Sequence, residues 1–234
     1  MDLTSGAFWA ALGSIILANV VLSGDNAVVI AMAARSLPLG QQRKAIVWGS
    51  AAAIAMRIVL TLAAVEMLRW PYLKLIGGVL LLYIGVSLLG ADDDAQDRQQ
   101  QVGGLLAAIR TILVADLVMS LDNVLAVAAA AQGDAPLLVV GLALSIPLIV
   151  FGSTLLLGVM ERFPIIITLG AALLGFLAGE MMLTDPAVSE RFGTISPDTI
   201  NGAGAIGAVA VVAAGQWWQY RVRARRGGRA RRVF

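Results

Sequence analysis

The chain of 234 residues contains neither cysteine nor histidine. The absence of cysteine excludes disulfides and thiolate-bound metals. The absence of histidine removes the commonest ligand of zinc and copper and the commonest general base of enzymes. Charged residues are also scarce, at 14% of the chain, whereas a soluble domain has about 25%. Any metal site in this chain must therefore be built mainly from oxygen ligands.

Hydrophobic residues take the place of these missing types and make up 59% of the chain. Several apolar runs exceed the ~20 residues that a helix needs to cross ~30 Å of hydrocarbon. The runs and their flanking residues predict an all-α integral membrane protein with about seven transmembrane helices. These helices are expected at residues 8–34, 45–68, 73–90, 105–131, 136–160, 165–184 and 200–220.

An internal repeat places the same polar motif in two of these spans. Residues 19–34 and 116–131 match at seven of sixteen positions, and both segments contain Ser-x-Asp-Asn. Each half continues with a second span, an aromatic-Pro turn and a Gly-rich third span. Repeat one therefore covers about residues 8–90 and repeat two about 105–184, with the helix at 200–220 outside the repeat. Because each repeat holds an odd number of spans, the two halves should be inverted, as in many secondary transporters.

The basic residues predict the orientation of this single transmembrane domain, residues 1–220. With the N-terminus outside, thirteen Lys and Arg lie on the inner side and three on the outer side, as the positive-inside rule requires. Residues 91–104 then form a cytoplasmic linker, and residues 221–234 form a basic cytoplasmic tail. Because the tail follows a membrane span, its arginines favour anionic lipids of the inner leaflet over nucleic acid as the partner.

The two Asp-Asn motifs are the candidate site. The expected members are Asp122, Asp116, Asp25, Asn26, Asn123 and Asn19. Residues seven apart share one face of a helix, so the two polar faces can meet near the bilayer centre. A carboxylate at that depth costs ~2.5–3.5 kcal/mol on insertion scales, whereas asparagine alone could join helices by hydrogen bonds. Three carboxylates with amide and carbonyl oxygens suit Mg²⁺, Ca²⁺ or Mn²⁺.

Residues beside these motifs predict how the site works. Ser23-Gly24 reads as an N-cap and flexible joint, and a helix broken there would expose backbone carbonyls as further ligands. Leu121 replaces this glycine in the second copy. Arg57, inside the second span, would neutralise an aspartate when no cation is bound, or else snorkel to an interface. Glu180 is a candidate ligand or proton carrier, or an interfacial carboxylate.

At these residues the chain resembles the TerC family of bacterial integral membrane proteins, which is named for tellurium resistance. The resemblance rests on Ser-Gly-Asp-Asn, Ser-Leu-Asp-Asn, Asp116 and the repeated three-span layout. It covers all but the basic tail and fits the short form without appended cytoplasmic domains. It implies a metal-ion transporter of the bacterial plasma membrane that exports Mn²⁺, with the metal as substrate and no cofactor. The residues by themselves indicate only a hard divalent cation, and Asn19 in place of Asp116 makes the site asymmetric.

Other functions are less consistent with the sequence. An exporter of a small cationic metabolite, such as a basic amino acid, would also need carboxylates, and Arg57 could then bind the metabolite's carboxyl group. A membrane enzyme is disfavoured because the chain lacks His, Cys and the Gly-x-Ser-x-Gly nucleophile motif. A scaffold would leave the three buried carboxylates without a role.

Overall fold

A computed structural model describes residues 6–21, 23–67, 70–90, 103–130 and 135–230, although the side chains of 62–67, 122–130, 222–230 and a few single positions lie outside this description. Every regular element in these ranges is an α-helix, which confirms the predicted all-α class. The helices are α1 (Gly6–Val21), α2 (Gly24–Arg35), α3 (Leu39–Met67), α4 (Leu73–Gly90), α6 (Gly103–Ala130), α7 (Ala135–Arg162), α8 (Ile165–Leu183), α9 (Pro186–Phe192) and α10 (Pro197–Ala230).

Six of the described helices, namely α3, α4, α6, α7, α8 and α10, are long and apolar enough to cross a membrane. The segment predicted as the first span, 8–34, is divided into α1 and α2, so the total of seven spans stays a prediction. The predicted joint at Ser23-Gly24 is confirmed, since α2 begins at Gly24. Ser23 stands at the N-cap position of α2, as predicted, but its side chain makes no capping bond and instead contacts Asn19 and Arg57.

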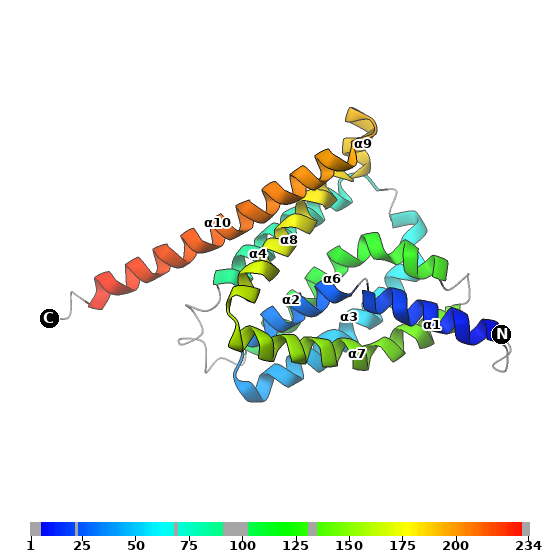
Figure 1. The fold of residues 1–234 in the computed structure, drawn as a ribbon, viewed down its shortest axis with the longest axis horizontal. Helices are drawn as coiled ribbons and strands as arrows, with labels where there is room; N and C mark the ends of the chain where they lie inside the picture. The colour runs from blue at the N-terminus through cyan, green and yellow to red at the C-terminus, as the bar shows by residue number, and fades with distance from the viewer. Residues whose placement is uncertain (1–5, 22, 68–69, 91–102, 131–134, 231–234) are drawn as a thin grey trace.

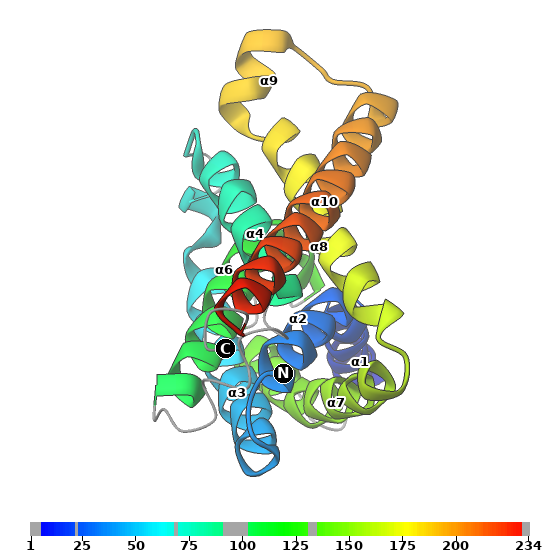
Figure 2. The same ribbon diagram turned by 90° about the vertical axis from the view of Figure 1, so that its left-hand side faces the viewer.

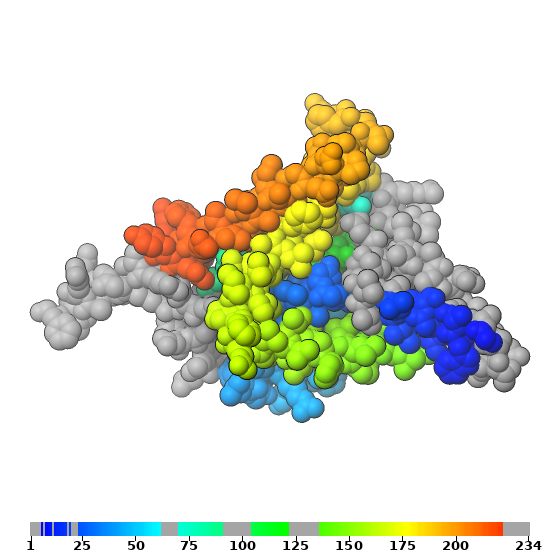
Figure 3. All heavy atoms as spheres, viewed as in Figure 1, coloured from blue at the N-terminus to red at the C-terminus, as the bar shows by residue number. Residues whose placement is uncertain are grey.

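The helices pack as two groups (Figures 1 and 2). The first group consists of α4, α8 and α10, and the second of α1, α2, α3, α6 and α7. Contacts of α4 with α6 and of α2 with α8 join the groups. The space-filling view shows α10 lying along α8 on the face that it displays (Figure 3). The polar motifs of the sequence all lie in the second group.

Glycines set the close packing of α8 against α10. A Cβ added to Gly175 would lie 2.3 Å from the carbonyl oxygen of Gly207, and one added to Gly179 would lie 2.2 Å from that of Ala203. Backbones can approach this closely only where side chains are absent, which is the usual way of packing helices in lipid. The helix α10 continues to Ala230, beyond its predicted end at residue 220, because arginine is a good helix former.

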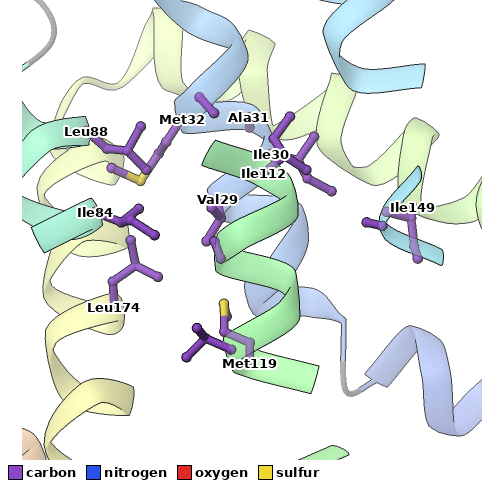
Figure 4. Close-up of a cluster of buried hydrophobic side chains, with 14 of the residues drawn as sticks. Val29, Ile30, Ala31, Met32, Ile84, Leu88, Ile112, Met119, Ile149 and Leu174 are labelled. Carbon is purple, nitrogen blue, oxygen red and sulfur yellow. The ribbon is translucent and has the colours of Figure 1, made fainter. Parts of the chain in front are cut away.

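The short helix α2 lies at the centre of the second group. Its residues Val29, Ile30, Ala31 and Met32 are at most 2% exposed. They pack against side chains of α4, α6, α7 and α8, as the close-up of this cluster shows (Figure 4). A helix that is apolar on all sides must be enclosed by other helices. The position of α2 therefore carries its polar first turn into the interior.

A buried carboxylate holds the turn that begins α4. Asp185 accepts hydrogen bonds from the backbone N–H groups of Tyr72, Lys74 and Leu75 at 3.0, 3.0 and 3.1 Å. It also caps α9 by accepting from the N–H of Ala187 at 2.8 Å. Burial alone would raise the pKa of Asp185, but these four donors outweigh it and hold the pKa below its ordinary value.

Candidate functional site

The side chain of Arg57 on α3 occupies the centre of the candidate site. Its Nη1 donates to Asn19 Oδ1 at 2.6 Å and to Ser23 Oγ at 2.7 Å. Its Nη2 donates to Asp116 Oδ1 at 2.5 Å, and its Nε donates to Ser120 Oγ at 3.0 Å. Ser120 in turn donates to Asp116 Oδ2 at 3.2 Å. One guanidinium thus joins three segments of the chain.

These partners are the equivalent residues of the two sequence repeats. Asn19 and Ser23 stand four residues apart in the first copy, and Asp116 and Ser120 stand four apart in the second. Asp116 and Ser120 therefore lie on one face of α6, whereas Asn19 lies in α1 and Ser23 lies in the break after it. The fold therefore brings the duplicated positions of both copies to the same guanidinium.

Burial makes this ion pair energetically important. Arg57 is 1% exposed and Asp116 is 5% exposed, so neither charge is stabilised by bulk water. Removing one partner of such a buried pair typically costs about 3–5 kcal/mol, because the other charge is left without compensation. The contacts argue against the snorkelling alternative for Arg57, since its side chain is 1% exposed and its guanidinium is bonded within the protein.

The first turn of α2 adds a second polar region. Asp25 is half-buried, accepts a hydrogen bond from the N–H of Asn26 at 2.8 Å, and lies within electrostatic range of Arg57 and Asp116. Asn26 is 3% exposed, and neither Nδ2 nor Oδ1 of its carboxamide has a hydrogen-bond partner within the described part of the chain. A buried polar atom without a partner costs about 1–3 kcal/mol. Such atoms are typical of a site that a ligand or water completes.

The break between α1 and α2 interrupts the helical backbone beside Arg57. At the end of a helix the last carbonyl groups have no intrahelical donor. The end of α1 at Val21 lies two positions before Ser23, which contacts Arg57. In the second copy α6 runs without a break from Gly103 to Ala130, because Leu121 replaces the flexible Gly24.

The structure gathers some of the predicted site residues and leaves others apart. Asn19 and Asp116 meet at Arg57, and Asp25 is near them, whereas the side chains of Asp122 and Asn123 lie outside the described residues. The sequence predicted a site lined by oxygen donors alone. The structure differs, because a guanidinium lies between Asn19 and Asp116. Among the side chains that the structure describes, no group of three or more carboxylates is arranged to hold a metal ion. Glu180, half-buried on α8, takes no part in the hydrogen bonds of Arg57.

Sequence reasoning missed two contributions. It treated Ser23 as a helix cap and did not consider Ser120, although both serines belong to the repeated motif and lie four residues after Asn19 and Asp116. It also left Asp185 outside the predicted helices, between the spans 165–184 and 200–220. The sequence Asp185-Pro186 is the usual signal of an N-cap followed by proline at the first helical position, and this signal would have located α9.

The fold and the buried ion pair together define a polytopic helical integral membrane protein with a polar site in its interior. The chain belongs to the TerC family, because the sequence model of the "Integral membrane protein TerC family" matches residues 4–224. The family resemblance seen in the Asp-Asn motifs is thereby confirmed.

Several bacterial membrane proteins are similar to this chain. Uncharacterized membrane protein YjbE of Bacillus subtilis is 47% identical over 73% of this chain and 78% of its own length. Uncharacterized membrane protein YceF of the same species is 24% identical over 76% of this chain and 73% of its own length. The UPF0053 inner membrane protein YgdQ of Escherichia coli is 28% identical over 50% of this chain and 56% of its own length. No solved structure matches the chain.

Proposed function

We propose that this protein is a transporter that exports a hard divalent cation, foremost Mn²⁺, from the bacterial cytoplasm by alternating access between two inverted halves. The observation that carries the proposal is the meeting of the duplicated polar positions at one buried point. Asn19 and Ser23 of the first copy and Asp116 and Ser120 of the second copy bind the same cationic group there. A site that holds one cationic group in the membrane interior has the charge and the oxygen atoms to hold a metal cation in its place.

Contacts between α4 and α8 support the proposed inversion of the halves. A Cβ on Gly78 would face the carbonyl oxygen of Ala178, and one on Gly85 would face that of Ala171. The residues ascend in one helix and descend in the other, so the helices are antiparallel. With an offset of 93 positions between the third spans of the two repeats, Gly78 corresponds to Ala171 and Gly85 corresponds to Ala178. Exchanging the two repeats therefore turns the Gly78–Ala178 contact into the Gly85–Ala171 contact. This is the pattern expected of a two-fold axis between inverted repeats.

A second pair of contacts agrees with this relationship. Gly49 of α3 faces the side chain of Ile112 in α6, and Gly141 of α7 faces that of Ile15 in α1. The two isoleucines lie just before the aligned Asp-Asn segments and have the same offset of 97 positions. The two glycines precede the aromatic-Pro turns at similar distances. Each second-span helix thus packs on the first-span helix of the other half.

The chemistry of the proposed site favours manganese, magnesium or calcium over softer metals. Asp122, Asp116 and Asp25 would be ligands, and Asn26, Asn123 and Asn19 would complete or shape the coordination shell. Hard divalent cations take carboxylate, amide and carbonyl oxygens. The buried Asn26 carboxamide, which has no partner among the described residues, supports a ligand at this point. Proton counter-transport through these carboxylates or Glu180 belongs to the same proposal.

The proposed setting is the bacterial plasma membrane, with the N-terminus outside and the arginine-rich tail on anionic lipids of the inner leaflet. The alternative, export of a small cationic metabolite, is less favoured by the contacts. That substrate needs a cationic group for its carboxyl, but the guanidinium of Arg57 is already occupied by Asp116.

Metal content in living cells tests this proposal. The intact chain and its Asp122→Asn variant are expressed in manganese-stressed bacteria, and cell-associated manganese, calcium and magnesium are measured by elemental analysis. We expect the intact chain to lower cell manganese and the variant to lose this effect at equal expression. Asp198→Asn, at an exposed position at the start of α10, is the matched control and should behave like the intact chain. Unchanged levels of all three metals with the intact chain would refute the proposal, and normal export by Asp122→Asn would refute the site.

A further inference from the structure

The guanidinium of Arg57 uses all three of its nitrogen atoms on the two repeat copies. Nη1 is bonded to Asn19 and Ser23, Nη2 to Asp116, and Nε to Ser120. Arginine has five N–H donors in a rigid fork, and at least four of them are used here. A side chain that only filled space would not need acceptors from both halves of the molecule.

Both oxygens of Asp116 are engaged in this arrangement. Oδ1 accepts from Arg57 and Oδ2 accepts from Ser120. A divalent cation that bound Asp116 while Arg57 stayed in place would stand beside a positive charge in a medium of low dielectric constant, where repulsion between like charges is strong. A cation at Asp116 and the guanidinium of Arg57 must therefore exclude each other.

We propose that Arg57 is a tethered cation that takes the place of the cargo in the empty transporter. This inference rests on the proposed function and adds a role for the state without cargo. When the metal leaves, the guanidinium returns to Asp116 and draws the serines and Asn19 onto itself. The charge of Asp116 is then compensated, which lowers the net charge that must be enclosed between the halves when the empty transporter changes its orientation.

The second repeat explains why one arginine is enough. The residue equivalent to Asp116 in the first copy is the neutral Asn19. The residue equivalent to Arg57 in α7 is Ile149, if Gly49 and Gly141 are taken as equivalent, and Ile149 lies in the apolar core (Figure 4). One arginine therefore faces one carboxylate across the duplicated site, and the pair is electrically balanced. Asp25, which is half-buried, and Asp122 are then left to attract the incoming cation.

The inference separates two transport modes that a purely structural ion pair would affect equally. Exchange of external for internal metal needs only the loaded transporter to reorient. Net transport also requires the empty transporter to reorient, and that step is the one that Arg57 would permit. Loss of the positive charge should therefore stop net transport and spare exchange.

The test uses the full chain in proteoliposomes loaded with MnCl₂, with radioactive manganese as the probe. Net efflux into metal-free buffer and exchange against external MnCl₂ are measured for the intact chain and for Arg57→Gln. We expect the ratio of net efflux to exchange to fall at least about tenfold in Arg57→Gln, because a carboxylate at membrane depth has lost its counter-charge. A parallel loss of both modes, or an unchanged ratio, would overturn the role proposed for Arg57.

Arg57→Lys provides the second variant if Arg57→Gln does not fold. Lysine keeps the charge but not the fork of donors, so the ratio should stay within about twofold of that of the intact chain. A drop in this ratio as large as that expected for Arg57→Gln would overturn the proposal. Arg35→Gln is the matched control for loss of an arginine, since Arg35 donates to the carbonyl of Leu88 at 3.0 Å, and its ratio should not change. If the intact chain showed neither mode, the proposed function itself would fail, which is a different outcome from an active chain with an insensitive Arg57.

Discussion

Asp185 accepts a hydrogen bond of 3.0 Å from the backbone N–H of Tyr72, which lies 113 residues earlier in the chain. Tyr72 has a φ of 70°, a left-handed conformation that is uncommon for residues other than glycine. The same carboxylate also holds the N–H groups of Lys74 and Leu75. Asp185 therefore stabilises a strained turn at the start of α4 while it caps α9.

Replacing Asp185 with alanine should lower stability strongly. The change leaves four backbone N–H groups without their acceptor, and each such group costs about 1–3 kcal/mol when buried. Because water reaches part of this turn, we expect a total loss of about 3–5 kcal/mol. Thermal unfolding of the purified protein in detergent measures the effect. Asp198→Ala, at an exposed position, is the control and should change stability by less than about 1 kcal/mol; an equally small effect of Asp185→Ala would contradict the hydrogen bonds described here.

Acid should remove the contribution of Asp185. Burial raises the pKa of Asp185, but the backbone donors lower it by more, so its pKa in the folded protein lies below the ordinary value. A lowered pKa stabilises the folded state fully above the unfolded value of about 3.9 and loses this effect as the pH falls through the folded pKa. The difference in unfolding temperature between the intact chain and Asp185→Asn should therefore be constant between about pH 5 and 7, a range that lies about one unit or more above the unfolded pKa. The difference should shrink below about pH 4. A difference that grew in acid would show that the carboxylate is not stabilised in the folded protein.

Because the backbone of Tyr72 is strained, we expect the glycine variant at this position to be more stable than the valine variant. Glycine tolerates a positive φ, whereas a β-branched residue does not. Tyr72→Gly should be about as stable as the intact chain, and Tyr72→Val should lose about 1–2 kcal/mol. Both variants lose the same aromatic ring, which is 60% exposed, so the comparison isolates the backbone. Unfolding temperatures measured in one detergent give the order, and a more stable valine variant would argue against the left-handed turn.

The contact between α8 and α10 should not accept even one methyl group. A Cβ on Gly175 would lie 2.3 Å from the carbonyl oxygen of Gly207, and backbone atoms at such a contact can move only with their helices. Gly175→Ala should therefore cost about 1–3 kcal/mol, as overpacking does. Gly202→Ala on the same contact helix is the control, because no atom lies within 4 Å of its added Cβ, and it should be neutral or stabilising by up to about 1 kcal/mol. Equal unfolding temperatures for the two variants would contradict the close packing.

Much of the secondary structure could be predicted from the sequence. The third span, 73–90, agrees with α4 residue for residue, because an aromatic-Pro turn precedes it and a glycine ends it. The break at Ser23-Gly24 could also be predicted, since glycine in the middle of a span weakens the helix. The start of α3 could not, because the polar residues of its first turns, among them Gln42, which is buried and bonded to the carbonyl of Leu37, hide the beginning of the helix from a hydropathy criterion.

The membership of the site was only partly predictable. Helical spacing placed Asn19 and Asp116 on polar faces, but it could not show which group would lie between them. Arg57 is separated from these two residues by 38 and 59 positions, and no local pattern connects residues so far apart. Ser120 was missed for the same reason, because its importance comes from a contact with α3 and not from its neighbours in sequence.

The sequence by itself determined that this is a helical membrane protein and that its polar motif occurs twice. Both conclusions follow from local chemistry, because a span must be apolar over its whole length and a repeat is visible wherever it occurs. Only the tertiary structure decided that the two copies of the motif hold one guanidinium, and that Asp116 is paired while the Asn26 carboxamide has no partner among the described residues. Charge pairing in a buried site depends on which side chains meet in space, since the interaction is strong only at contact distance and in the absence of water.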